Sequence, residues 1–530
     1  MRYTFLGFRE QGAGSREQGA GSREQGAGSR EQGAGKREEG RGKREERKNL
    51  VYLIRLKTAI VHTAIKNLDE ILTVKKQPLH NAFKFWKNIS SGSNNRQIFG
   101  AAAKVTGMTV LVKMVSVGKE FVVAWSFGTS NEVDALVIAL LLPQFIDNVV
   151  AGSFKPAFIP TYIREREQQG QQQAQKLLSG AMSYVIGLLL IVTILMVAFA
   201  PFYLPKIAAG FDSGKIDFTF QLLLAVSPLL ILNGIVSIFQ AVLNSGERFG
   251  LAAILPIAIP ALSIILLLKF SSWGVFALVI ALLGGTLIQI IFLGISLRRK
   301  GISLIPKLYK LDSKLKEVFR LYGASAAAAF LIGSTTLVDQ SMAAMLAPGS
   351  VAALSYGYKL TALPLTLATI GLGTVATPYF SKMIAREDWQ GVKHTLKKYL
   401  KLILITTIPL TIILLICSVP IVRILLQRGS FTADDTSLVA QIQALYALQI
   451  PFYVGNILVV RLITSMRMNY VFTWTCAFNL LVNIICNFLF IQWIGIAGIA
   501  LSTSIIYVIC FLLHTTFITQ KINTNYQQKI

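Results

Sequence analysis

The residues of this chain best suited to chemistry are ammonium and carboxylate groups inside long apolar stretches. Lys113, Lys119 and Glu120 fall within one such stretch, and Lys359 falls within another much later in the chain. A charge at the centre of a bilayer costs at least ~2.5–3.5 kcal/mol, so a charge retained there usually faces a cavity or a partner. Lysines that converge on a cavity favour an anionic ligand such as a phosphate or pyrophosphate. We therefore expect an anion to bind within the membrane.

Further charged side chains lie inside the apolar stretches. We include Asp134, Asp339 and Arg461 among the candidate substrate-binding residues, together with the four residues above. Lys104, Asp134 and Lys155 lie close to the ends of their stretches, where a side chain can extend to the membrane surface. For those three residues an interfacial location is the leading interpretation, and a role toward substrate is the alternative.

The apolar stretches themselves predict the class of protein. Of the 530 residues, 53% are hydrophobic and only 15% are charged, and the mean hydropathy is +0.56, whereas a soluble domain has roughly 25% charged residues. About 20 apolar residues span a bilayer as a helix, because a helix satisfies its own backbone hydrogen bonds there. Many such stretches in one chain predict an all-α integral membrane protein.

Twelve membrane-spanning helices can be placed along the chain. Lysine and arginine concentrate in the loops that follow even-numbered spans, whereas the loops after odd-numbered spans hold only Lys206, Lys215, Lys269, Arg423 and Arg428. Because basic loops stay in the cytoplasm, both termini are predicted to be cytoplasmic. The predicted spans are 100–127, 132–161, 177–200, 217–244, 249–269, 273–297, 316–346, 351–381, 399–418, 434–463, 468–491 and 495–519.

The spans divide into two similar sets of six. Val133 precedes Pro160 in the second span by the same number of residues as Val351 precedes Pro378 in the eighth. The fourth and tenth spans both contain a proline, Pro228 and Pro451. An even number of helices per repeat makes the halves parallel, related by an axis along the membrane normal. We expect a half at 100–300, a half at 315–520 and a cytoplasmic tail at 521–530.

Residues that permit bending lie in the second and eighth spans. Helices bend at proline and glycine, and such bends would let two halves rock against each other. The alternative is that these residues are merely common in membrane helices. The candidate hinge residues are Pro143, Gly152, Pro156, Pro364 and Gly371.

The remaining composition excludes several functions. Of the net charge of +26, +10 lies in residues 1–99, where 20 basic residues face 10 acidic ones, and the rest lies mostly in loops, so nucleic-acid binding is not indicated. A seven-residue repeat, REQGAGS, has no large apolar position, so residues 1–95 are predicted to form a disordered repeat tail and a basic linker. The alternative is that the repeat lies upstream of the true translation start and is not part of the native protein. The four cysteines and four histidines are scattered, and no metal site is expected.

No enzyme motif is visible. The chain contains no P-loop, GxSxG, HExxH or Asp-rich metal motif. We expect neither an enzyme nor a cofactor. Transport by this chain would be driven by an ion gradient, by the membrane potential or by substrate supply. The expected partners are a lipid-linked substrate and membrane lipids; the oligomeric state stays open, and a monomer is compatible with the sequence.

Several stretches between about 100 and 518 resemble a known family. They are 112–164, which contains FGTSNEVDALVIALL, then VLNSGERFGLAAILP at 242–256, APGSVAALSYGYKLTALPLTLATIGLGTVATPYFSK at 347–382 and LLQRGSFTADD at 425–435. In this order they are similar to the MurJ/MviN lipid II flippases of the MOP exporter superfamily. The resemblance implies a MATE-like fold in the bacterial inner membrane and a flippase that moves a polyprenyl-pyrophosphate-linked saccharide, lipid II first among the candidates, by alternating access.

The resemblance also implies roles for individual residues, with some departures. The family's cavity arginines fall on Lys113, Lys119 and Lys359, so charge is kept but the bidentate fork is lost. Asp134 matches the family's acidic residue at the start of the second helix. The family's arginine and glutamate of that helix have no counterpart, since Asn148 and a one-residue deletion replace them, and two further C-terminal helices are absent from the sequence given.

Other functions stay open on the sequence. One is an ion-coupled exporter of small molecules, which would depend on an acidic residue such as Asp339 or Asp134. A second is a flippase for another lipid-linked polysaccharide unit. The last are a membrane scaffold without transport and an enzyme with an unrecognised site.

Overall fold

The computed structural model describes residues 94–246, 249–309, 312–466 and 468–527. The chain separates into two units, Met1–Arg96 and Gln97–Ile530, and almost every described residue belongs to the second. The predicted tail and basic linker lie outside the described residues. Within the described ranges every regular element is a helix, which confirms the all-α prediction.

The twelve predicted spans correspond to twelve long helical segments in the part of the chain that the structure describes. Two spans are divided into α7–α8 and α16–α17, and a third is divided into α9, a short 3₁₀ turn and α10. The segments are α3 (Asn94–Phe127), α4 (Asn131–Gln169), α5 (Gln171–Ala198), α7 (Ser213–Val226) with α8 (Pro228–Ser245), α9 (Phe249–Ile254) with α10 (Ala258–Lys269), α11 (Phe276–Arg298), α12 (Ser313–Ala344), α13 (Ser350–Ala385), α14 (Trp389–Ile416), α16 (Ala433–Ala447) with α17 (Ile450–Ser465), α18 (Asn469–Ile494) and α19 (Ala497–Gln527).

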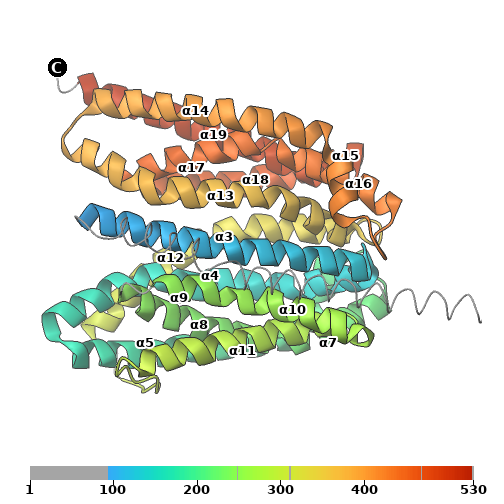
Figure 1. Cartoon of the computed structure of the whole chain (residues 1–530), viewed down its shortest axis with the longest axis horizontal. Coiled ribbons are helices and arrows are strands. Elements are labelled where there is room, and N and C mark those ends of the chain that lie inside the picture. The colour runs from blue at the N-terminus through green and yellow to red at the C-terminus, as the bar shows by residue number, and fades with distance from the viewer. Residues whose placement is uncertain (1–93, 247–248, 310–311, 467, 528–530) are drawn as a thin grey trace, which may run out of the picture. The chain divides into compact units, whose positions relative to one another are not determined.

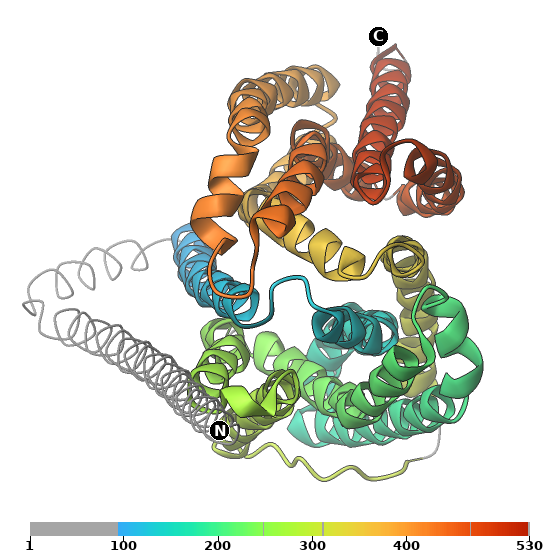
Figure 2. The same ribbon diagram turned by 90° about the vertical axis from the view of Figure 1, so that its right-hand side faces the viewer.

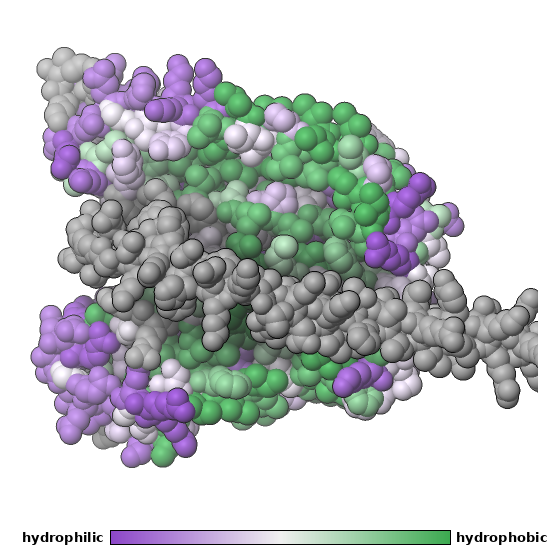
Figure 3. Space-filling model, viewed as in Figure 1, coloured by the Kyte–Doolittle hydropathy of each residue, from purple (hydrophilic) through white to green (hydrophobic). Residues whose placement is uncertain are grey.

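Ten of these segments are long and apolar enough to cross a membrane by length and composition. The two others are α3 and α13, which carry the lysines of the candidate site. Apolar side chains form a band between two polar ends of the molecule in Figure 3, and the long helices run between those ends in Figure 1. Large side chains such as Leu195, Ile291 and Phe488 of the long helices are exposed, as expected for a surface that contacts lipid.

Proline positions explain where helices divide. A proline lacks the N–H that an internal helix turn needs, and α8 begins at Pro228 while Pro451 is the second residue of α17. The candidate hinges behave differently, because α4 continues through Pro143, Gly152 and Pro156 and α13 continues through Pro364 and Gly371. The hinge roles stay predictions.

Two short helices at equivalent places were not predicted. They are α6 (Ala200–Ile207), which follows α5, and α15 (Ser418–Leu426), which follows α14. Ala200 and Ser418 are as far apart in the chain as Val133 and Val351. Both were hidden in the sequence because their apolar residues adjoin the long apolar helices before them.

The long helices form two bundles. Viewed along the helices, α5–α11 gather in one bundle and α14–α19 in the other, with α3, α4, α12 and α13 between them (Figure 2). The extensive packing of α12 on α4 and of α13 on α17 joins these layers. One buried core lies where α4, α7, α13 and α16 meet, and one further core lies within each bundle.

Candidate functional site

Two of the predicted lysines meet on one carboxylate. The Lys119 ammonium lies 2.7 Å from Glu120 Oε1, and the Lys359 ammonium donates to Glu120 Oε2 at 3.0 Å. Lys119 and Glu120 belong to α3 and Lys359 belongs to α13, so the cluster joins the first and eighth spans. We call these three residues the ion cluster. Two positive charges and one negative charge leave it with a formal charge of +1.

The surroundings of the ion cluster are apolar but not sealed. The exposed fractions of the side chains are 25% for Lys119, 17% for Glu120 and 40% for Lys359. The Lys359 ammonium lies 5.7 Å from the centre of the Tyr356 ring, one turn earlier on α13, a distance at which a cation is attracted to an aromatic face. A cavity of about 20 Å³ adjoins the cluster and is lined by Val117, Glu120, Phe121, Tyr356, Lys359, Leu360, Leu363 and Leu426.

Lys113 does not join the ion cluster. Its side chain is exposed and makes no hydrogen bond or ion pair with any described residue. The helical geometry explains this, because residues six apart are separated by ~9 Å along the axis and point in different directions. The structure thus brings together three of the predicted site residues and leaves Lys113 apart from them.

Asp134 has structural partners. It is only 1% exposed; its Oδ1 accepts from the Ala352 N–H and its Oδ2 from the Gly349 N–H, both at 2.7 Å. The Lys215 ammonium lies 2.8 Å from the same Oδ2. A carboxylate at a helix N-terminus satisfies backbone donors and complements the helix dipole. Asp134 therefore links α4 to the start of α13 and to α7, and sequence reasoning missed this arrangement.

Asp339 and Arg461 line a second site, where α12 and α13 meet the bundle of α14–α19. A pocket of about 500 Å³ lies among α12, α13, α17, α18 and α19, and both residues border it. The Asp339 carboxylate accepts from Asn487 Nδ2 at 2.7 Å and Asn483 Nδ2 at 3.0 Å, with Thr503 Oγ1 at 3.5 Å. Arg461 is half-buried and its side chain pairs with no described residue.

The two asparagines that contact Asp339 have side-chain oxygen atoms without hydrogen-bond partners. Asn483 Oδ1 and Asn487 Oδ1 are buried and lack a hydrogen-bond partner. Carboxylate, amide and hydroxyl oxygens are the ligands that hard cations prefer. No group of three or more His, Cys, Asp or Glu side chains that could hold a metal ion occurs among the described residues. A cation at Asp339 would therefore rely on amide oxygens, and the two asparagines, which present Nδ2 to the carboxylate, would have to turn their amide groups to supply them.

Two polar pairs also lie where α4 packs against α8. The Lys155 ammonium donates to Gln240 Oε1 at 2.6 Å, and Asn233 Nδ2 donates to Asp147 Oδ2 at 3.2 Å, both between α4 and α8. Lys155 thus contacts the protein, in addition to any contact with the membrane surface. The glutamine and asparagine partners gave no sequence signal, because they stand in an apolar helix.

Two parallel bundles of long apolar helices, with an ion cluster between the first and eighth spans, define a multi-pass membrane transporter. Solved structures with this fold include the lipid II flippase MurJ in an inward closed conformation, with a TM-score of 0.70, 24% identity and coverage of 78% of this chain and 87% of that one. An inward-facing multidrug resistance MATE transporter of the MOP superfamily gives a TM-score of 0.66 at 11% identity, with 81% and 100% coverage. These likenesses establish the MOP fold.

The sequence comparisons place the chain within one family. The family model described as "Lipid II flippase MurJ" matches residues 123–530, and the chain belongs to this family. A probable lipid II flippase MurJ of Synechocystis is 24% identical over 78% of this chain and 80% of its own length. The lipid II flippase MurJ of Burkholderia cenocepacia is 25% identical over 77% and 81%. The family is one of transporters of the bacterial inner membrane, not of enzymes. Lys119 and Glu120 lie just before the matched residues.

Proposed function

We propose that this chain is a flippase that moves lipid II, a polyprenyl-pyrophosphate-linked saccharide, across the bacterial inner membrane by alternating access. The observation that carries the proposal is the ion cluster, in which lysines from two different spans share one carboxylate. Family membership supports the substrate class. An ion-coupled exporter of small molecules would not need two ammonium groups at this junction.

The chemistry of the ion cluster suits a diphosphate. Each ammonium has three donors and can bind a phosphate oxygen as a point charge. Glu120 satisfies Lys119 and Lys359 in the absence of substrate, which lowers the cost of holding two ammonium groups in the membrane. A diphosphate carries more negative charge than one carboxylate, so it competes with Glu120 for both lysines. Lys113 points in a different direction from Lys119 on α3, so the contribution that we propose for it is a longer-range positive charge and not a direct contact with the diphosphate.

The same competition offers a way to couple binding to movement. The Lys359–Glu120 contact joins α3 to α13 at 3.0 Å, and a substrate that takes Lys359 from Glu120 removes this contact between the helices. A ligand shifts a conformational equilibrium only when it makes different contacts in the two states. Loss of one ion pair and gain of two phosphate contacts is such a difference.

We place both termini in the cytoplasm. The basic loops after even-numbered spans support this orientation, and α3 begins at the same end of the molecule at which α19 ends (Figure 1). A fluorescent reporter fused after residue 530 should fluoresce only if that end is cytoplasmic. An export-dependent reporter active at the same fusion point would reverse the orientation.

Replacement of a lipid II flippase tests the function directly. A strain in which its own flippase is depleted should survive when this chain is supplied, and lipid II should become accessible at the outer surface. Lys119→Ala and Lys359→Ala should each abolish rescue while the protein still inserts. The matched control is Lys206→Ala, an exposed lysine of α6 outside the cluster. Good expression without rescue would favour another lipid-linked saccharide as substrate.

Coupling to a cation is a second feature that we propose. The buried Asp339, with two asparagine oxygens that lack partners, supports a site for a proton or a monovalent hard cation in the α12–α18–α19 region. Asp134 is a weaker candidate for this role, because two backbone N–H groups and Lys215 already occupy its oxygens. Transport by Asp339→Asn should lose any dependence on sodium or on pH that the unmodified chain shows, and unchanged dependence would exclude this site.

A further inference from the structure

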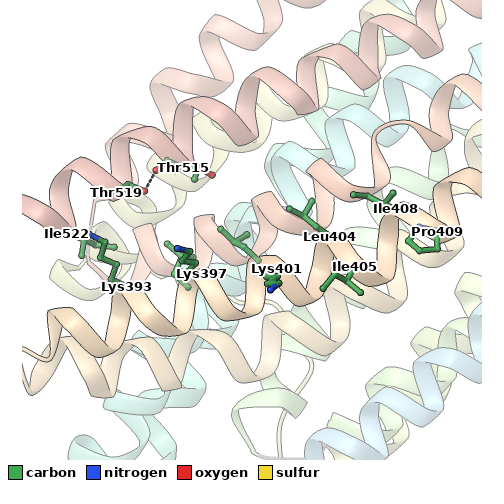
Figure 4. A pocket seen from close by; sticks show the side chains of 12 residues that line it. Lys393, Lys397, Lys401, Leu404, Ile405, Ile408, Pro409, Thr515, Thr519 and Ile522 are labelled. Atoms are coloured by element: carbon green, nitrogen blue, oxygen red, sulfur yellow. Dashed lines mark hydrogen bonds between the residues drawn. The ribbon is translucent and has the colours of Figure 1, made fainter.

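An open groove lies on the outer face of the bundle of α14–α19, away from the ion cluster. It has a volume of about 740 Å³ and runs between α14 and α19. Figure 4 shows its lining: three lysines follow one another along α14, the apolar side chains continue the same row, and α19 supplies the opposite wall. The lining residues are Lys393, Leu396, Lys397, Leu400, Lys401, Leu404, Ile405, Ile408, Pro409, Thr515, Thr519 and Ile522.

The lysines form a regular basic row. Lys393, Lys397 and Lys401 are four residues apart, so they lie on one face of α14. The Lys393 ammonium donates to Asn523 Oδ1 of α19 at 2.9 Å. Lys397 and Lys401 are exposed and pair with no described residue. Two ammonium groups are therefore available to an anion at the same end of the groove.

The length of the groove matches one leaflet of a bilayer. Lys393 and Lys397 precede the ninth apolar span and Lys401 lies at its start, so the row is at the level of lipid headgroups on the predicted cytoplasmic side. From Lys401 to Pro409 the helix rises ~12 Å. Half of a hydrocarbon core is ~15 Å thick. The apolar part of the groove thus has the depth of the acyl chains in the cytoplasmic leaflet.

We propose that this groove binds an anionic membrane phospholipid. Its phosphate contacts Lys397 and Lys401, and one acyl chain lies along Leu404, Ile405 and Ile408. Basic pockets between membrane helices on the cytoplasmic side are suited to anionic headgroups, because ammonium groups there attract phosphate and the adjoining apolar walls accept the chains. The inference does not rest on the proposed flippase function.

The charges favour a phospholipid over other occupants. A membrane helix from a partner protein would fit the apolar walls but would leave Lys397 and Lys401 without an anion. The transported lipid also carries phosphate, but the ion cluster on α3 and α13 already supplies its candidate site. An anionic phospholipid of the cytoplasmic leaflet meets both the charge and the length of the groove.

Native mass spectrometry of the full chain in detergent, titrated with phosphatidylglycerol, tests the proposal. Attraction of ~1 kcal/mol for each lysine at the membrane surface predicts that Lys397→Gln/Lys401→Gln weakens phosphatidylglycerol binding about 20- to 30-fold. The matched control is Lys398→Gln, which removes an exposed lysine from a different face of α14 and should bind like the unmodified chain. Leu404→Trp should also weaken binding, by filling the groove without a change in charge.

Three results would overturn the proposal. One is equal binding by the unmodified chain and Lys397→Gln/Lys401→Gln. Another is binding of phosphatidylcholine as tight as that of phosphatidylglycerol, which would show that the lysines do not select the headgroup. The third is displacement of phosphatidylglycerol from the unmodified chain by equimolar undecaprenyl pyrophosphate, which would assign the groove to the transported lipid. Rescue of a flippase-depleted strain is scored separately, so failure of the groove and failure of the flippase function are distinguishable.

Discussion

Glu120 is the residue on which the proposed transport chemistry depends. Its two oxygens contact different lysines, one beside it on α3 and one on α13. The arrangement has two separable roles, since the lysines can bind an anion and the Lys359–Glu120 pair can hold two helices together. Charge reversal can separate them, because it keeps the ion pair and moves the ammonium from α13 to α3.

The double variant Glu120→Lys/Lys359→Glu should restore the α3–α13 contact yet fail to transport. It keeps the formal charge of the ion cluster at +1, but α13 then presents a carboxylate to the substrate phosphate. Lys359→Arg should retain transport, because a guanidinium keeps the charge and adds bidentate donors. Accessible lipid II at the outer surface is the measurement. Full activity of the reversed pair would mean that only the contact between helices matters.

Asp134 should be important for stability in its own right. Asp134→Ala leaves two backbone N–H groups at the start of α13 and the Lys215 ammonium, whose side chain is 8% exposed, without their partner. Removing one partner of a buried ion pair costs about 3–5 kcal/mol, so the melting temperature in detergent should fall by several degrees. The control is Asp217→Ala, an exposed carboxylate of α7, which should melt like the unmodified chain.

The sequence predicted the site residues unevenly, for physical reasons. Lys119 and Lys359 stand out because charge is costly inside an apolar stretch, and their proximity follows from that cost. The role of Asp134 could not be predicted, because its donors are backbone N–H groups of Gly349 and Ala352, which every residue type carries. The contacts of Asn483 and Asn487 with Asp339 could not be predicted either, because a neutral amide costs less than a charge in a membrane helix and does not stand out in the sequence.

At the scale of elements, glycine sets how closely some helices approach. A Cβ added at Gly285 of α11 would lie 2.7 Å from Ile259 Cα of α10, a distance that requires the backbone to shift. Small residues allow membrane helices to pack closely, because association there depends on van der Waals contact. The α10–α11 pair is therefore held by a contact between backbones.

Gly285→Val should separate α10 from α11 and destabilise the protein. Overpacking typically costs ~1–3 kcal/mol, and here the obstacle is backbone that cannot change rotamer. Gly187→Val on α5 is the control, because no atom lies within 4 Å of the position its Cβ would take. Thermal unfolding in detergent should distinguish the two. A melting temperature for Gly285→Val equal to that of Gly187→Val would contradict close α10–α11 packing.

Hydropathy predicted the helices better than their interruptions. Ten of the twelve spans follow from apolar length and composition, whereas α3 and α13 do not. Pro228 and Pro451 mark two divisions because a missing N–H breaks the hydrogen-bond pattern. Pro143 and Pro156 show that the rule is incomplete, since α4 continues through both. Whether a proline divides a membrane helix depends on the neighbours that pack against it, and those neighbours are distant in sequence.

At the scale of the whole helical unit, contacts join the first six spans to the last six at the end where α3 leads into α4. Ser430 N–H donates to Trp125 O at 3.0 Å, Thr129 Oγ1 donates to Asp435 Oδ1, and Asp134 accepts from the start of α13. Gly349 has φ +86° and an added Cβ would lie 2.6 Å from Thr129 O, so both conformation and space require glycine there. These contacts close one end of the junction between the two sets of six spans.

Alternating access requires this end to open during transport, and a reversible cross-link can test that requirement. Cysteines introduced as Thr129→Cys and Asp435→Cys, joined by a short bis-methanethiosulfonate reagent, should abolish transport, and a reductant should restore it. Each single variant treated with the same reagent is the control for the chain's own four cysteines. The substrate must leave between the two sets of six spans when they separate. A linker shorter than the required opening therefore keeps the protein closed and traps the substrate. Undiminished transport by the cross-linked protein would mean that the lipid passes without opening this end, and the alternating-access mechanism would then be wrong.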